Sequence, residues 1–156
     1  MIRNNVTRLL DSRKIVYTAF ELPNEKLGAV EAAGFLGVTP SLVYKTIVVM
    51  REGTGKAILA VVPGDREVDL KALAKAVGEK KLTLPTEREA ERLTGLQAGG
   101  ISPLALIQRG FQTVIDLSAQ TLPEIYISGG QRGLNIRLRA SDLITLTNAR
   151  LASICR

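Results

Sequence analysis

The chain has 156 residues, of which 46% are hydrophobic and 4% aromatic, and its formal net charge at pH 7 is +6. It contains no histidine, no tryptophan and a single cysteine, Cys155, which excludes Ser-His-Asp and Cys-His catalysis, histidine-ligated or Cys-x-x-Cys metal sites, and dithiol redox chemistry. Its length and apolar content are enough for a core, and we expect residues 1–156 to form a single domain. Because no apolar run reaches membrane-spanning length and no signal-peptide pattern is present, we expect a cytoplasmic protein without a membrane partner.

Hydrophobic periodicity, capping residues and turn residues predict a mixture of helices and strands. In chain order, we expect helices over residues 5–11 and 29–36, a helical turn from residue 39, helices capped by Asp69 and Thr86 that end at residues 77 and 93, and a last helix capped by Ser141. Strands are expected over residues 14–22, 44–50, 56–62, 80–84, 112–117, 124–128 and 134–139. The turn at residues 52–55 makes an antiparallel hairpin. The predicted class is therefore α+β, a mixed, mostly antiparallel sheet or partly closed barrel flanked by short helices.

Two glycine pairs lie beside predicted strands, in the segments GGISP (residues 99–103) and GGQRG (residues 129–133). Glycine tolerates positive φ and leaves a backbone N–H unobstructed by a side chain. Two such loops are suited to one pocket whose main-chain donors bind a carbonyl, a phosphate or a developing oxyanion. The alternative interpretation is that both are simply tight turns.

One lysine occupies an unusual place in the strand pattern. Since strand side chains alternate between faces, Lys45 shares its face with Ile47 and Val49. A lysine at the end of an apolar face can lie at the mouth of a pocket and donate to an anion or to a polarised carbonyl. The alternative is a strand-end lysine whose ammonium simply extends to solvent.

Positive charge is concentrated near the C-terminus, where residues 129–156 contain five arginines against one acid, Asp142. This asymmetry favours a polyanionic partner held through its phosphates. Arg137 and Arg139 alternate with apolar residues, so we expect both to project from one face of their strand.

Four motifs occur in a characteristic order: EAA at residues 31–33, VYKT at 43–46, GGISP at 99–103 and YISGGQRGL at 126–134. Together they resemble the YbaK family, the free-standing relatives of the prolyl-tRNA synthetase editing domain, over most of the chain. The resemblance implies the fold of that family and a trans-editing activity, the hydrolysis of the ester of a mischarged aminoacyl-tRNA. The implied substrate is a small amino acid on proline tRNA, cysteine first and then alanine or serine, with prolyl-tRNA synthetase as a further partner.

The resemblance also implies roles for particular residues. It assigns catalysis to Lys45, Gly100, Ser102 and Gly129. It assigns substrate binding to Gly99, Ile101, Pro103, Ser128, Gly130 and Asn135. The tRNA-binding residues are expected from the charge pattern instead, and they are Arg132, Arg137 and Arg139 in the most basic part of the chain.

Asn135 stands where family members commonly carry an acid, and an asparagine cannot act as a base or a counter-ion. No metal and no cofactor are expected, because an aminoacyl ester is already activated and the substrate's own thiol or ribose hydroxyl can assist the reaction. Two other functions stay open. One is a non-catalytic module that binds an aminoacyl or nucleotide end as an accessory to a synthetase. The other is a nucleic-acid-binding protein with an exposed basic stripe and no pocket.

Overall fold

The structure is a computed structural model that describes residues 2–156, so residue 1 of the predicted domain lies outside it. The α-helices are α1 (Asn5–Ser12), α2 (Ala29–Leu36), α3 (Leu70–Val77), α4 (Glu87–Thr94) and α5 (Ala140–Thr147). The strands are β1 (Tyr17–Glu21), β2 (Tyr44–Arg51), β3 (Ile58–Pro63), β4 (Leu82–Thr83), β5 (Gln112–Asp116), β6 (Glu124–Ser128), β7 (Leu134–Arg139) and β8 (Arg150–Ala152). Short 3₁₀ turns span Pro40–Leu42, Pro103–Ala105 and Leu117–Thr121.

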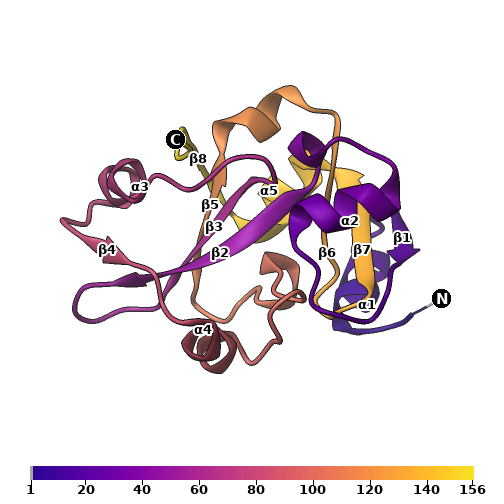
Figure 1. The fold of residues 1–156 in the computed structure, drawn as a ribbon, viewed down its shortest axis with the longest axis horizontal. Helices are drawn as coiled ribbons and strands as arrows, with labels where there is room; N and C mark the ends of the chain where they lie inside the picture. Colours follow the sequence, from indigo (N-terminus) through magenta and orange to yellow (C-terminus); the bar gives the residue numbers. More distant parts are fainter. Residues whose placement is uncertain (1) are drawn as a thin grey trace.

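The strands form two sheets (Figure 1). The smaller sheet has the order β1-β7-β6 and is antiparallel throughout. The larger sheet has the order β4-β2-β3-β5-β8, with antiparallel pairs around β2 and parallel pairs on both sides of β5. A single parallel bridge between Val43 and Tyr126 connects the two sheets. The predicted α+β class with a mixed, mostly antiparallel sheet is confirmed.

Strand β2 has a continuous partner on one side only. On that side it pairs with β3 from Tyr44 to Val49, whereas on the other side β4 pairs only with Met50 and Arg51. The bridge to Tyr126 lies at the opposite end, just before the strand begins. Within the described residues, the stretch between these two contacts therefore has no strand beside it, and β2 presents an open edge there.

The direction of the backbone groups along β2 follows from its pairing. The carbonyl oxygen of Val43 accepts a hydrogen bond of 2.8 Å from the N–H of Gly64, on the side of β3. Alternate residues of a strand direct their backbone groups to opposite sides. Thr46 and Val48 therefore turn their N–H and C=O groups toward the open edge.

Four clusters of buried hydrophobic side chains hold the sheets and helices together, and two of them are the larger ones. The first lies between the smaller sheet and helices α1 and α5, where buried side chains include Leu10, Ile127, Ile136, Leu138 and Leu143. The second lies between the larger sheet and α3, where they include Ile58, Val62, Leu73, Val114 and Ile154. Strand β3 is buried along its whole length, as expected for a central strand covered on both faces.

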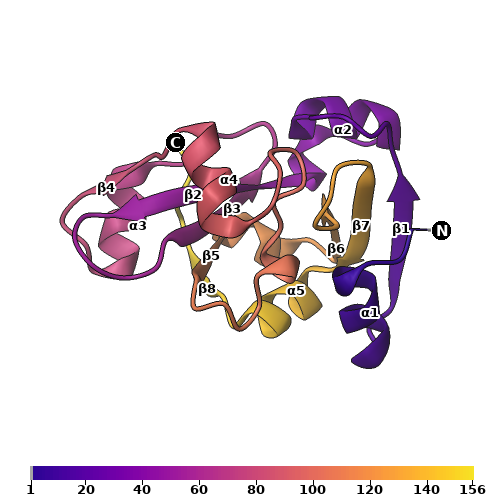
Figure 2. The same ribbon diagram turned by 90° about the horizontal axis from the view of Figure 1, so that it is seen from below.

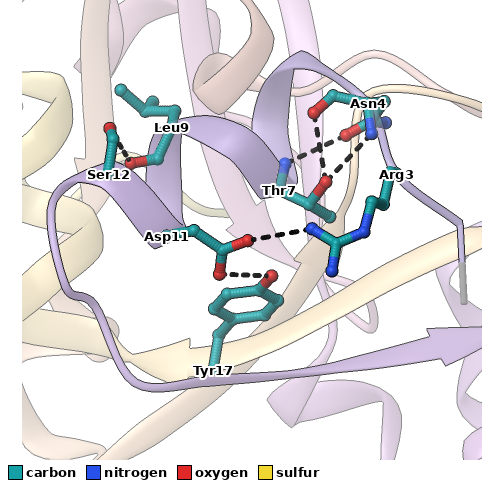
Figure 3. Close-up of polar contacts among 7 residues, drawn as sticks. All are labelled: Arg3, Asn4, Thr7, Leu9, Asp11, Ser12 and Tyr17. Carbon is teal, nitrogen blue, oxygen red and sulfur yellow. Dashed lines mark hydrogen bonds and ion pairs between the residues drawn. The ribbon is translucent and has the colours of Figure 1, made fainter.

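Helix α1 is fixed at both ends (Figure 3). At its start, Asn4 and Thr7 form a reciprocal capping box, in which each side chain accepts a hydrogen bond from the other residue's backbone N–H. At its end, Asp11 accepts a hydrogen bond of 3.0 Å from the hydroxyl of Tyr17 in β1. Arg3 completes the cluster with an ion pair of 3.7 Å to the same carboxylate.

Some predicted boundaries are wrong. The strand expected from residue 14 begins at Tyr17, because Lys14 adopts a φ of 56° in the preceding turn. Ser141 does not cap the last helix, which begins one residue earlier with Arg139 in the N-cap position and no side-chain cap. Strand β8 was not expected, since it is three residues long and depends on parallel pairing with the distant β5.

Asp116 ties the C-terminal segment to the end of β5. It is 6% exposed, and its carboxylate accepts hydrogen bonds of 3.0 Å from Ile154 N–H and 3.1 Å from Ser118 N–H. Burial alone raises the pKa of this carboxyl, but the hydrogen bonds from Ser118 and Ile154 outweigh burial and hold the pKa below its ordinary value. Burial, followed by the neighbouring Asp116, raises the pKa of the Cys155 thiol to about 12. This thiol is therefore protonated at neutral pH and is a poor nucleophile.

We expect Asp116→Asn to lower the free energy of unfolding at pH 7 by about 1–3 kcal/mol, because the variant lacks the charged acceptor of two buried N–H groups. The native pKa lies below the unfolded one, so the carboxylate stabilises the fold above its ordinary pKa and loses this effect as pH falls through the native pKa. The deficit of the variant should therefore shrink at about pH 3. Urea unfolding at both pH values measures it, with the exposed Asp65→Asn as the control. An equal deficit at both pH values would contradict this role of the Asp116 charge.

Candidate active site

A cavity of about 440 Å³ opens along the unpaired edge of β2. Its walls come from β2, the beginning of α2, the β4–α4 connection, the segment 98–101 and the adjoining ends of β6 and β7. Figure 2 shows how α2 and α4 flank this part of the molecule. Most lining side chains are apolar, so the few polar groups in the cavity stand out. A concave, mainly apolar site of this size is typical of small-molecule binding.

Lys45 is the one cationic side chain among the described residues that line the cavity. Its side chain is 23% exposed, and its ammonium lies 3.4 Å from a carboxylate oxygen of Glu67. Glu67 does not line the cavity, and its side chain is 72% exposed. An ion pair so open to water is weak, so Lys45 can exchange this partner for a stronger anion at low cost.

Two polar atoms in the cavity wall have no hydrogen-bond partner within residues 2–156. They are the hydroxyl oxygen of Thr46 and the amide oxygen of Asn135, and both are buried. Asn135 as a whole is 6% exposed. An unsatisfied buried polar group costs about 1–3 kcal/mol of stability. Thr46 and Asn135 line the same cavity as Lys45, which places both unpartnered oxygens in residues of the cavity wall.

The first glycine loop contributes directly to the cavity. Gly99 and Ile101 line it, whereas Gly100 does not. The Gly100 N–H donates to the carbonyl of Gln97 at 2.8 Å and closes a turn in which Gly99 has a φ of +89°. No acceptor within residues 2–156 binds the N–H of Gly99 or Ile101. Gly99 and Ile101 are therefore the residues of this loop that both line the cavity and carry an unoccupied N–H donor.

The second glycine loop lies behind the cavity wall and is firmly anchored. The Gly129 N–H donates to Leu134 O at 2.9 Å, and the Gly130 N–H donates to the hydroxyl of Ser128 at 3.3 Å. The side-chain amide of Asn4 donates to Gly129 O at 2.9 Å, which connects the loop to the start of α1. At the edges of this loop, Ser128 and Gly133 line the cavity.

The two glycine loops pack against each other. A Cβ atom at Gly100 would lie 2.8 Å from the backbone of Gln131. Across the same contact, the guanidinium Nε of Arg132 donates to the carbonyl of Ala98 at 2.7 Å. The second loop therefore supports the first, and Arg132 connects them.

The structure brings some of the predicted site residues together and leaves others outside the cavity. Lys45, Gly99, Ile101, Ser128 and Asn135 line it. The other predicted catalytic and substrate-binding residues do not: Gly100, Ser102, Pro103, Gly129 and Gly130. Their predicted roles stay predictions.

Ser102 is fully buried and accepts a hydrogen bond of 3.2 Å from Leu104 N–H, as the cap of a 3₁₀ turn. The arginines predicted to bind tRNA are also largely engaged. Arg137 donates to the Thr18 hydroxyl at 3.1 Å and lies 5.5 Å from the centre of the Phe20 ring. Arg139 is exposed at the start of α5.

Sequence reasoning missed several contributors to the site, among them Glu25 and Glu87, which line the cavity. Thr46 directly follows Lys45 in the VYKT motif. Its position next to the predicted pocket lysine could have identified it as a site residue. Glu67 is 22 residues from Lys45 in the chain, and nothing in the sequence pattern pairs the two. Within the described residues, no group of three or more histidine, cysteine, aspartate or glutamate side chains is placed to hold a metal ion. Nor is any helix in residues 2–156 long and apolar enough to cross a membrane.

Known proteins are similar to this chain in both sequence and fold. Residues 24–146 match the aminoacyl-tRNA editing domain family. A proposed Cys-tRNA(Pro)/Cys-tRNA(Cys) deacylase of Enterococcus faecalis, EbsC, is 34% identical over 154 residues, which cover 97% of this chain and 93% of that protein. The proline–tRNA ligase of Trichlorobacter lovleyi is 31% identical over 73% of this chain, a region that makes up 19% of the ligase.

A solved structure agrees with these sequence matches. The crystal structure of a proposed trans-editing enzyme for prolyl-tRNA synthetase superposes with a TM-score of 0.79 at 26% identity, covering 100% of this chain and 99% of that one. The fold is thus that of the aminoacyl-tRNA editing domains. The chain belongs to the aminoacyl-tRNA editing domain family, and by family it is an aminoacyl-tRNA deacylase. The resemblance indicated by the four motifs is confirmed.

We expect Gly100→Ala to lower the free energy of unfolding by about 1–3 kcal/mol, because its Cβ has no room against the second glycine loop. Gly34→Ala in α2 is the matched control, since no atom lies within 4 Å of the added Cβ. The control should be neutral or more stable by up to about 1 kcal/mol. Urea unfolding compares the two. If Gly100→Ala is as stable as the control, the two loops do not pack together as described.

Proposed function

We propose that residues 1–156 act as one trans-editing domain, which hydrolyses the ester bond of a mischarged aminoacyl-tRNA in the cytoplasm. The proposed substrate is a small amino acid on proline tRNA, with cysteine preferred over alanine and serine, and prolyl-tRNA synthetase is a further partner. One observation carries this proposal: the cavity combines the Lys45 cation with the unpartnered oxygens of Thr46 and Asn135. The likeness to EbsC supports the choice of cysteine.

The chemistry needs no protein base. Water adds to the ester carbonyl, the carbon–oxygen bond to the ribose breaks, and the products are the free amino acid and a tRNA with its ribose hydroxyl restored. Because the ester is already activated, the protein has to position it and stabilise the negative charge that develops on the carbonyl oxygen.

We assign the oxyanion donors to the N–H groups of Gly99 and Ile101, which line the cavity and have no acceptor among residues 2–156. We assign this role to them in place of Gly100 and Gly129, the glycines expected from the sequence, because the N–H groups of those two are already hydrogen-bonded. Lys45 then leaves Glu67 and binds a phosphate or hydroxyl at the tRNA end.

The polar oxygens provide the recognition of the amino acid. We assign to the amide oxygen of Asn135 and the hydroxyl of Thr46 the hydrogen bonds from the α-ammonium group, which every aminoacyl ester carries. Neither contact depends on the side chain of the esterified amino acid. Selection between amino acids therefore rests on the space between the apolar walls of the cavity. Such walls discriminate between side chains that differ by about one methylene by only 10–200-fold, and we expect activity on several small residues.

Deacylation of proline tRNA charged with cysteine, alanine, serine or proline tests the proposal. Lys45→Ala should lower the rate of ester hydrolysis by about 10²–10³, the effect typical of removing one charge-assisted interaction in the transition state. Lys56→Ala removes a lysine that lies over the Phe111 ring and does not line the cavity, so it serves as the matched control and should keep the wild-type rate.

Two outcomes would count against the proposal. A folded Lys45→Ala variant with near-normal activity would remove this residue from the mechanism. Binding of charged tRNA by the wild-type protein without any turnover would favour the non-catalytic binding module instead.

A further inference from the structure

A group of lysines on α3 and in the connection from α3 to β4 has no partner for its charge. Lys71, Lys75, Lys80 and Lys81 are all exposed. Within residues 2–156, none of their ammonium groups makes a hydrogen bond, an ion pair or a ring contact. Lys71 and Lys75 are one turn apart, so they share a face of α3. We call these four residues the lysine surface.

The acids near the lysine surface are already engaged. Asp69 caps α3 by accepting hydrogen bonds of 3.0 and 3.1 Å from the N–H groups of Lys71 and Ala72. Glu79 forms an ion pair of 3.0 Å with Arg51. The lysine surface therefore retains its positive charge, in contrast to Arg132 and Arg137, which are bound to neighbouring protein groups.

The chain connects the lysine surface to the cavity wall. Lys80 and Lys81 lead directly into β4, and the residues that follow β4, Leu84 and Pro85, line the cavity. Strand β4 also pairs with the end of β2, whose first half forms another wall of the cavity. Figures 1 and 2 both place α3 and β4 at one end of the molecule and α1 and β1 at the other.

We propose that the lysine surface binds the phosphate backbone of the tRNA acceptor end whose terminal aminoacyl nucleotide enters the cavity. This inference rests on the proposed function, and it places the tRNA on a different face from the one predicted from Arg137 and Arg139. Lysine ammonium groups are point charges that bind phosphates without fixed geometry. The lysines therefore position the RNA and add salt-dependent affinity, whereas the cavity recognises the amino acid.

The test compares two substrates that share the same reacting end: the full charged tRNA and a short aminoacyl ester of the CCA trinucleotide. In the variant Lys80→Glu/Lys81→Glu, the ratio of the KM for tRNA to the KM for the short ester should rise roughly tenfold at low salt. The slope of log affinity against log salt should fall by about one unit for each phosphate that the variant no longer neutralises. The control is Arg8→Glu/Arg13→Glu, which changes the net charge by the same amount in α1 and at its C-cap. This control should leave the ratio of KM values unchanged.

An unchanged ratio in the lysine variant would overturn the proposal, and so would an equal rise in the α1 variant. If the wild-type protein hydrolyses neither ester, the proposed function fails, but binding of uncharged proline tRNA by fluorescence anisotropy still tests the surface. The lysine variant should then bind more weakly than the α1 variant. Binding of the wild type to anionic lipid vesicles and not to tRNA would also overturn the proposal.

Discussion

The site depends on a strand, β2, that has no neighbouring strand on one side along most of its length. Strand β2 pairs fully with β3, but its other edge meets β6 only through the bridge at Val43 and β4 only at Met50 and Arg51. An edge that leaves backbone groups unpaired is usually covered or paired in a stable protein. Here the two sheets and α2 surround it without covering it, and the space that remains is the cavity. The backbone groups of Thr46 and Val48 turn toward that space because β3 uses the groups of the alternate residues.

The rest of the structure holds the walls of this cavity in place. The amide of Asn4 ties α1 to the second glycine loop, and that loop in turn supports the first through Gly100 and Arg132. On the other side, the N–H of Arg156 donates to Glu67 O at 3.0 Å, so the C-terminal segment fixes the residue that pairs with Lys45. The site is therefore assembled from interactions between segments that are far apart in the sequence.

The sequence predicted the components of the site better than their arrangement. Lys45 and Asn135 were identified from motifs and strand position, and both line the cavity. The glycine pairs were also identified, but a sequence pattern does not tell which amide is free, because that depends on the turn the loop adopts. Arg132 illustrates the same limit, since its acceptor on Ala98 is 34 residues away and no sequence pattern pairs the two. Its predicted tRNA contact stays a prediction. The fold class was predictable because helix caps, turns and strand periodicity are local signals, whereas β8 depends on a distant partner.

The wall of the cavity beside the open edge of β2 keeps polar atoms unpartnered, at a cost in stability, and we propose that these atoms bind substrate. Asn135→Leu tests this most directly, because leucine has a similar shape and removes the unpartnered amide oxygen. Two measurements on this one variant are needed, the free energy of unfolding and the KM for aminoacyl-tRNA. We expect the free energy of unfolding to rise by about 1 kcal/mol while the KM increases. A variant that is less stable than the wild type and keeps its KM would show that Asn135 supports the fold and not the substrate.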